Sequence, residues 1–230
     1  MHIEILQLTE GARRAIGTTV VIDVFRAFST ACYLFNAGAG RVIPVEQVDD
    51  AFKLKERFPD SILLGERYEK KVDGFDFGNS PTHISKCDFG GRTIVMTTSS
   101  GTKGLMNATG AEEILTGSFV NAGAIVKYIA KRQPAKVSLV CMGYEGRRIT
   151  QEDTFLAEFI KDKLLNLQTD FQKMKDLLRV GDGARLLDPA NHEWSPASDF
   201  DLCLALDRFD FVLKLEDEEG LKVLKVTAAD

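Results

Sequence analysis

The chain has few of the residues that build disulfide scaffolds and zinc sites. Its 230 residues include only four cysteines and three histidines. The cysteines have no C-x-x-C spacing and three of them lie in apolar runs, so we expect buried, reduced thiols. The histidines lack metal-ligand spacing, which argues against a zinc site. The cysteines are Cys32, Cys87, Cys141 and Cys203, and the histidines are His2, His83 and His192.

Long apolar runs and long basic runs are also missing. No apolar stretch approaches the roughly 18 residues that a membrane span needs, and the first residues show no basic segment followed by an apolar one. Lys and Arg number 29 against 34 Asp and Glu, for a net charge of -5. We therefore expect a cytoplasmic protein that binds neither a membrane nor nucleic acid.

The candidate catalytic segments do not match three common signatures. No serine lies in a G-x-S-x-G elbow, and the segment Gly101–Gly104 does not fit the Walker loop G-x-x-x-x-G-K-[ST]. The second residue after Asp23 is Phe25, so Asp23 does not begin the Asp-x-Asp pair of haloacid-dehalogenase phosphatases. The chemistry of this chain must come from another arrangement.

Strand and helix patterns alternate along the chain with short connections. This favours an α/β fold with a largely parallel or mixed sheet covered on both faces. We expect one domain over residues 1–230, with its C-terminal part free to form a smaller lobe. That part should contain a loop over 181–196, a helix over 199–209, and a β-hairpin built from 211–215 and 221–226.

The stretch Thr18–Ala37 holds the best candidate for a chemical centre. Residues 18–24 predict a strand buried on both faces, and residues 27–37 predict a helix packed on it. Asp23 and Arg26 then lie at the carboxyl end of a strand, where open α/β sheets bind ligands. Asp23 can hold a metal ion or attack phosphorus, and Arg26 can bind a phosphate or carboxylate. The alternative is that the two side chains pair with each other and cap the turn.

The segment Glu66–Pro81 predicts a long polar loop, and such loops usually have a function. Glu66 and Arg67 follow a short strand and repeat the acid-plus-arginine arrangement. Ser80 and the proline after it have the pattern of a helix N-cap and first helical position, which explains both without a ligand. That explanation leaves Asn79 and the Glu66–Arg67 pair unaccounted for.

Hydroxyl groups and glycines follow the next predicted strand, 93–98. Thr98, Gly101 and Thr102 lie where this strand passes into a short helix, so their side-chain and backbone donors can bind an oxyanion. The alternative is a capped helix start without a ligand.

Asp153 lies in the first turn of a predicted helix that ends at Leu167. Thr150 followed by Asp153 approximates a capping box, so this carboxylate also has a structural explanation. Glu152 and Asp153 point about 100° apart on a helix. At most one of them faces a common site, and we choose Asp153.

Acids, arginines and hydroxyls together fit a hard divalent cation that holds an anionic substrate. The candidate ligands Asp23, Glu66 and Asp153 are all oxygen donors, so Mg2+ suits them better than zinc. The two arginines are placed to neutralise the substrate. Arg26, at a helix start, can bind one anion of such a substrate, and Arg67, at the start of the polar loop, can bind another.

Several motifs occur in order along the chain: Ile22–Ala27 with Ser29-Thr30, Gly65–Arg67, Gly74–Pro81, Thr97-Thr98 with Gly101-Thr102, and Glu152–Thr154. Together they resemble the 2-phosphosulfolactate phosphatases of coenzyme M biosynthesis, over almost the whole chain. The resemblance implies a three-layer α/β/α fold. It also implies a magnesium-dependent phosphatase that cleaves a phosphate ester on a short chain bearing a carboxylate and a sulfonate.

The resemblance also implies roles for individual residues. The matching positions are Asp23, Arg26, Glu66, Arg67, Asn79 and Asp153. We expect catalysis from Asp23, Arg26, Glu66 and Asp153, and substrate binding by Arg67, Asn79, Ser80, Thr98, Gly101 and Thr102. Two segments depart from the family's pattern, because Ser99-Ser100 replaces a Thr-Asn or Asn-like pair and Met142–Tyr144 replaces a more usual Ala-Gly. The exact substrate therefore stays open.

Two chemical routes fit these residues. Asp23 attacks phosphorus to form an aspartyl-phosphate, or the carboxylates hold Mg2+ and orient a water molecule. Two other functions also fit: a phosphatase for a different phosphorylated hydroxyacid, and a non-catalytic binder of small phosphorylated acids. The sequence leaves open whether two copies form a homodimer.

Overall fold

The computed structural model describes residues 1–229, and ten of its strands form one sheet. The strands are β1 (His2–Gln7), β2 (Gly17–Ile22), β3 (Arg41–Pro44), β4 (Ile62–Arg67), β5 (Lys70–Lys71), β6 (Thr93–Thr97), β7 (Ala111–Gly117), β8 (Lys136–Cys141), β9 (Phe211–Glu218) and β10 (Leu221–Ala228). The larger helices are α1 (Leu8–Arg14), α2 (Ala27–Asn36), α3 (Val48–Arg57), α5 (Gly101–Asn107), α6 (Ala122–Arg132), α7 (Gln151–Leu164) and α8 (Phe171–Val180). Shorter helical segments are α4 (Pro81–Ile84), η1 (Phe119–Asn121), α9 (Ala184–Leu187), η2 (Pro189–Asn191) and α10 (Ser198–Cys203).

The C-terminal hairpin joins two groups of parallel strands. One group has the order β1-β8-β2-β7 and the other β3-β6-β4, and β9 and β10 lie between them. β9 pairs antiparallel with β7, and β10 pairs antiparallel with β3 through a single residue pair, Leu224 and Val42. The predicted mixed sheet and hairpin are confirmed, and the hairpin is the connection between the two halves of the sheet.

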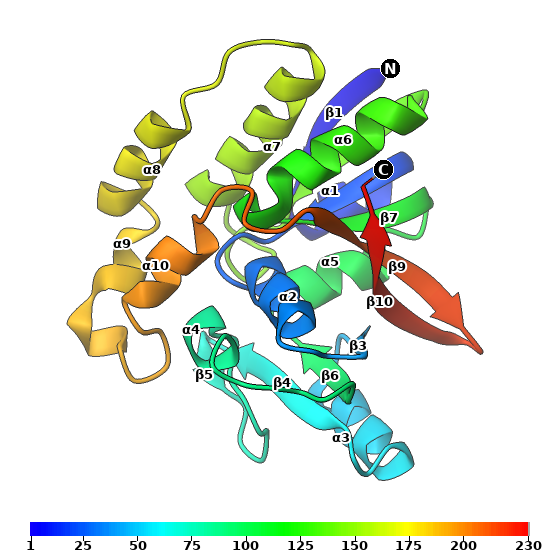
Figure 1. The fold of residues 1–230 in the computed structure, drawn as a ribbon, viewed down its shortest axis with the longest axis vertical. Coiled ribbons are helices and arrows are strands. Elements are labelled where there is room, and N and C mark those ends of the chain that lie inside the picture. The colour runs from blue at the N-terminus through cyan, green and yellow to red at the C-terminus, as the bar shows by residue number, and fades with distance from the viewer. Residues whose placement is uncertain (230) are drawn as a thin grey trace.

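Helices cover both faces of the sheet, as Figure 1 shows. Val21 of β2 packs in a core that includes residues of α1, α2 and α5, whereas Val20 and Ile22 pack in a core with α6 and α7. All six residues of β2 are buried, as an unbroken apolar run predicts. A third, smaller cluster joins α3 to β4 and β6. The α/β/α arrangement implied by the resemblance is therefore confirmed.

Strand ends from both groups meet at one place. The segments that end or follow β2 and β8 in one group, and β4 and β6 in the other, line a single pocket. The hairpin separates the two groups in the sheet, so the pocket joins segments from both halves of the sheet. Carboxyl ends of parallel strands are where α/β sheets bind ligands.

Two predictions for the C-terminal part were wrong. The helix expected over 199–209 is only α10, because the backbone N–H groups of Asp207 and Phe209 donate to carbonyls of η1, at 3.1 and 2.8 Å. Tertiary hydrogen bonds thus replace helical ones. The loop expected over 181–196 contains α9 and η2, and the Asp188 carboxylate caps η2 by accepting from the Ala190 N–H.

The polar loop predicted over Glu66–Pro81 is shorter than expected. β4 continues through Arg67 and pairs with the two residues of β5. The chain beyond β5 is tied back to the sheet, because the Gly65 N–H donates to the Phe77 carbonyl at 3.0 Å. Glu66 is consequently part of a strand and sits on a rigid support.

All four cysteines are free thiols, and three are buried, as predicted. Cys87 is partly exposed. Within residues 1–229, none of the helices has both the length and the apolar character needed to cross a membrane.

Candidate active site

Asp23 directly follows the buried strand β2 and points into the pocket. Its side chain is nearly enclosed, with 5% of the residue exposed. One carboxylate oxygen, Oδ1, accepts from the Ala27 N–H at the start of α2, at 3.1 Å. A Cβ atom at position 101 would lie 2.9 Å from the other oxygen, Oδ2, so a glycine is needed there. Gly101 thus makes room for the Asp23 carboxylate.

Burial dominates the protonation of Asp23. Burial, together with the negative charges of Glu66 and Glu152, raises the pKa of this carboxyl group to about 7. Hydrogen bonds from the backbone of Ala27 and Gly101 oppose this shift. An acid whose charge is disfavoured by its surroundings is a candidate functional group, and here the missing component is positive charge.

Glu66 is held in place by three donors. Its Oε1 accepts from the Ser99 N–H at 2.7 Å, and its Oε2 accepts from the Glu69 N–H at 2.9 Å and the Ser99 hydroxyl at 3.2 Å. β4 provides the backbone on one side and the end of β6 provides Ser99 on the other. The orientation of this carboxylate is therefore fixed before any ligand binds.

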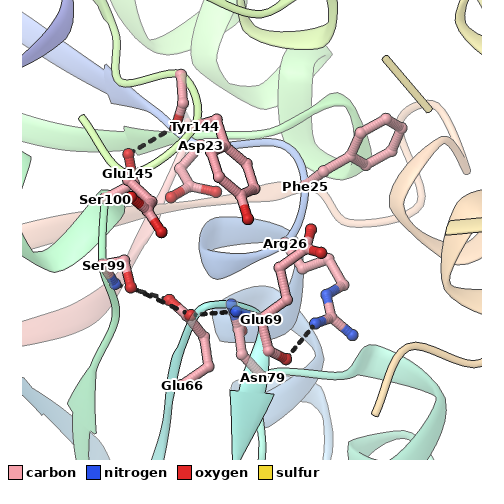
Figure 2. A pocket seen from close by; sticks show the side chains of 11 residues that line it. Asp23, Phe25, Arg26, Glu66, Glu69, Asn79, Ser99, Ser100, Tyr144 and Glu145 are labelled. Carbon is pink, nitrogen blue, oxygen red and sulfur yellow. Dashed lines mark hydrogen bonds between the residues drawn. The ribbon is translucent and has the colours of Figure 1, made fainter. Parts of the chain in front are cut away.

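The acidic pocket, as we call it, is partly open to solvent. Figure 2 shows Asp23 and Tyr144 on one side of it and Glu66 and Asn79 on the other. Four carboxylates and a single arginine are among its lining residues. The full lining is Asp23, Phe25, Arg26, Glu66, Glu69, Asn79, Ser99, Ser100, Gly143, Tyr144 and Glu145.

Arg26 lines this pocket, but its charge is already paired. Its Nη1 donates to the Asp199 carboxylate at 2.8 Å and to the Trp194 carbonyl at 2.9 Å, and its Nη2 donates to the Glu69 carbonyl at 3.1 Å. The Arg26 and Asp199 side chains are 3% and 0% exposed. The alternative is therefore wrong in pairing Asp23 with Arg26, although Asp23 does cap the turn through the Ala27 N–H. Arg26 instead joins three segments of the chain.

Asp199 also determines the surroundings of Ser80. The buried Ser80 hydroxyl donates to Asp199 Oδ1 at 2.8 Å, and the same oxygen accepts from the Thr82 N–H and hydroxyl. Ser80 does occupy the N-cap position of α4, but its side chain makes no capping hydrogen bond. The structure therefore places the Ser80 hydroxyl on a buried acid.

Asn79 lines the acidic pocket and has an amide oxygen without a partner among the described residues. The residue is 4% exposed, and its Oδ1 is buried without a hydrogen-bond partner within residues 1–229. A buried acceptor without a donor is costly in a folded protein. A cation or a donor brought by a ligand would satisfy this oxygen.

Asp153 lies behind the acidic pocket. Its Oδ1 accepts from the Val24 N–H at 2.9 Å and its Oδ2 accepts from the Gly143 N–H at 2.7 Å. Thr150 makes no side-chain cap at the start of α7, so the capping-box alternative is wrong. Burial, with the charges of Glu152 and Asp23, raises the Asp153 pKa well above its usual value, and these two N–H groups oppose the rise.

The substrate-binding residues predicted near the ends of β4 and β6 form hydrogen bonds with other groups of the protein. The Thr98 and Thr102 hydroxyls each accept from the other residue's backbone N–H, at 3.1 and 2.9 Å, and so close the start of α5. Arg67 donates to the carbonyls of Glu66 and Glu46 and to the Thr97 hydroxyl. Of these residues, Thr98 and Arg67 also line a neighbouring pocket.

The two departures from the family's pattern connect loops. The Ser99 backbone and hydroxyl hold Glu66, whereas the Ser100 hydroxyl donates to the Gly143 carbonyl at 2.7 Å and accepts from the Gly146 N–H at 3.0 Å. Ser100 thereby fixes the turn after β8, which brings Tyr144 to the pocket.

Sequence reasoning missed several residues around the acidic pocket. Glu69 and Glu145 line it, and only their position after predicted strands could have indicated them. Tyr144 also lines the pocket, and its segment was noticed only as a departure from the family's pattern. Arg185 lies behind the wall and donates to Glu69 at 2.9 Å and to Glu152 at 3.0 Å. Burial opposes the charge of Arg185, but these two carboxylates outweigh burial and raise its pKa. No local pattern indicates Arg185 or its partners.

The donors in the acidic pocket fit a magnesium ion that keeps part of its water shell. No three Asp, Glu, His or Cys side chains within residues 1–229 are grouped so that they could hold a metal ion by themselves. Asp23, Glu66 and the unpartnered Asn79 oxygen nevertheless line one pocket. Mg2+ usually takes one or two carboxylates and completes its shell with water and substrate phosphate.

Proteins similar to this chain share one description. The model of the 2-phosphosulpholactate phosphatase family matches residues 4–218. A probable 2-phosphosulfolactate phosphatase of Caldanaerobacter subterraneus subsp. tengcongensis is 35% identical over 86% of this chain and 87% of its own length. One from Carboxydothermus hydrogenoformans is 31% identical over 98% of both chains. One from Thermotoga petrophila is 40% identical over 73% of this chain and 66% of its own.

The fold, the pocket at the strand ends and these relatives define the class of the protein, a phosphoric monoester hydrolase. Within this class, the chain belongs to the 2-phosphosulpholactate phosphatase family. The resemblance indicated by the ordered motifs is thus confirmed.

Proposed function

We propose that the protein hydrolyses the phosphate monoester of a small anionic hydroxyacid, converting 2-phosphosulfolactate to 3-sulfolactate and phosphate with the help of Mg2+. The observation that carries the proposal is the charge of the acidic pocket. Four carboxylates line it, and its one arginine is already paired with Asp199. A phosphoryl group needs charge neutralisation there, and a divalent cation supplies it.

Asp23, Glu66 and the Asn79 amide oxygen are the residues that would hold Mg2+. When bound, the ion would offset the charge of the phosphoryl oxygens. Both routes for the reaction stay compatible with this set, namely attack by Asp23 and attack by water. Rapid quenching of a single turnover with 32P-labelled substrate separates them, because only attack by Asp23 leaves label on the protein.

Other residues around the pocket position the groups that bind the substrate. Ser99 and the backbone of Glu69 fix the Glu66 carboxylate. Asp153 holds the Val24 N–H next to Asp23 and the Gly143 N–H next to Tyr144, so it orients two loops at once. We therefore assign Asp153 as a positioning residue, in place of the third metal ligand expected from the sequence. Correct placement of reacting groups is a large part of phosphoryl-transfer catalysis.

The test is phosphate release from a panel of esters: 2-phosphosulfolactate, 2-phospholactate, 3-phosphoglycerate and phenyl phosphate. We expect release in the presence of Mg2+, fastest from 2-phosphosulfolactate, and almost none in excess chelator. Full activity in chelator would contradict the role of the metal. Binding of the esters without any release would favour a non-catalytic binding protein. Coenzyme M biosynthesis and the cytoplasm stay predictions from the resemblance and the composition.

A further inference from the structure

A second pocket adjoins the acidic pocket. Ser99 and Glu145 line both, so the two pockets share a wall. The second pocket also receives side chains from the end of β4, from α5 and from the turn after β8. We call it the basic pocket, because the cations Arg67, Lys103 and Arg147 line it, together with Glu46 and the two shared residues.

Two of the three cations have no partner in the protein. Arg67 donates to two carbonyls and a hydroxyl, at 2.7 to 2.9 Å, and is held still. The Lys103 ammonium and the Arg147 guanidinium, in contrast, have no hydrogen-bond or ion-pair partner within residues 1–229. Their donors are available to a ligand.

The two acids in the lining, Glu46 and Glu145, form no ion pair with these cations among the described residues. The Glu46 carboxylate accepts only from the Asn107 amide, at 3.5 Å, and Glu145 forms no ion pair with another described residue. Lys103 is the third residue of α5, and the first turn of a helix disfavours a cation. A single unpaired lysine is ordinary on a surface. Three cations converging beside a substrate pocket, two of them unpaired, are better explained by an anion that binds between them.

We propose that the basic pocket binds the second anionic group of the substrate, a carboxylate or a sulfonate, through Lys103 and Arg147. This inference rests on the proposed function, in which the phosphoryl group occupies the acidic pocket. A short hydroxyacid carries its other anion only a few bonds from the phosphoester, and the shared wall makes both pockets reachable at once. Arg67 contributes fixed positive charge, and the two unpartnered side chains donate charge-assisted hydrogen bonds.

The test is a comparison of substrates that differ in their anions. Phenyl phosphate has no second anion, 2-phospholactate adds a carboxylate, and 2-phosphosulfolactate adds a carboxylate and a sulfonate. Lys103→Met and Arg147→Gln should each raise KM roughly tenfold to a hundredfold for substrates whose second anion is bound, with kcat little changed. KM for phenyl phosphate should not change. An effect on 2-phosphosulfolactate alone would identify the sulfonate as the bound group, and an effect on both would identify the carboxylate.

Lys86→Met is the matched control, because Lys86 is exposed, unpaired within the described residues and outside both pockets. Variants that change KM equally for all three substrates, or for none, would overturn the inference. A second measurement does not depend on turnover: calorimetric titration of 3-sulfolactate into wild type and Lys103→Met. If the wild type hydrolyses no ester, the proposed function fails. The titration then still tests whether the basic pocket binds the anion. Equal affinities, or no binding to the wild type, would overturn the role of the basic pocket.

Discussion

The acidic and basic pockets share a wall but are built in opposite ways. In the acidic pocket, short side chains come from strand ends and are fixed by backbone N–H groups, as Glu66 is by Ser99 and Glu69. In the basic pocket, Arg67 at the end of β4 is held as well. The long side chains of Lys103 and Arg147, however, come from a helix and a turn and have no partner among residues 1–229. One pocket is preorganised and the other can adapt.

This difference matches two tasks in one reaction. Chemistry at phosphorus needs groups that are in place before the transition state, because preorganised charge does not have to rearrange during the reaction. Holding the rest of a substrate requires only affinity, which flexible cations can provide. The contrast therefore predicts that variants in the acidic pocket lower kcat, whereas variants in the basic pocket raise KM.

The largest effect should come from Asp23. We expect Asp23→Asn to lower kcat on the order of a thousandfold or more, because the variant removes a charged oxygen at the reacting phosphoryl group. The side chain keeps its shape, so circular dichroism should show an intact fold. Asp73→Asn, at an exposed carboxylate without a partner in the described residues, is the control. If Asp23→Asn keeps more than a tenth of the wild-type turnover, Asp23 is structural and the acidic pocket is not the reaction centre.

Arg26 should show that not every cation near phosphate is catalytic. Arg26→Ala leaves Asp199 buried without its partner, and breaking such a pair typically costs about 3–5 kcal/mol of the free energy of unfolding. Urea denaturation measures this cost. Arg14→Ala is the control, because Arg14 pairs with Glu4 at 4.0 Å on the surface, where a pair is worth under about 1 kcal/mol. A large loss of kcat with unchanged stability would instead place Arg26 on the phosphoryl group, as the sequence suggested.

The main residues of the acidic pocket could be predicted from the sequence, because the signals for them lie in short stretches of the chain. Asp23 and Glu66 each end an apolar run, so the strand that supports them is visible in the pattern. Asn79 could be recognised because the helix-cap pattern explained the neighbouring Ser80 but gave no reason for Asn79. In each case a short stretch contains both the support and the functional group.

The remaining features depend on contacts that are distant in sequence. Asp199 and Arg26 are 173 positions apart in the sequence, and no local pattern near either residue indicates that they form an ion pair. Glu152 was set aside because adjacent residues on a helix point apart, yet its carboxylate is buried beside the site on Arg185. The hairpin was predicted, but its place between two parallel groups was not, because strand order depends on packing.

The pKa of Asp23 gives a pH dependence that tests how strongly the acidic pocket needs a cation. Because this pKa is raised from 3.8 to about 7, the folded protein binds a proton more tightly than the unfolded chain between these values. Without metal, stability should therefore fall as pH rises through this range. A pKa unit is worth about 1.4 kcal/mol, so Asp23→Asn should gain a few kcal/mol relative to wild type between pH 4 and 8. Added Mg2+ should shrink this gain, and parallel stability curves for the two proteins would contradict the argument.

The smallest effect separates Asp153 from Glu66, the two acids that the sequence treated alike. Each oxygen of Asp153 accepts one backbone N–H, whereas an asparagine offers one oxygen and turns its NH2 group toward the other donor. Asp153→Asn should therefore cost about 1–3 kcal/mol of stability, measured by urea denaturation. The Mg2+ concentration for half activity should stay close to that of the wild type, because Asp153 lies outside the lining of the acidic pocket. Glu66→Gln is the matched comparison, and it should raise that concentration roughly tenfold or more by removing a ligand charge. If Asp153→Asn raises the Mg2+ requirement as much as Glu66→Gln, both acids hold the ion and Asp153 regains the role first expected of it.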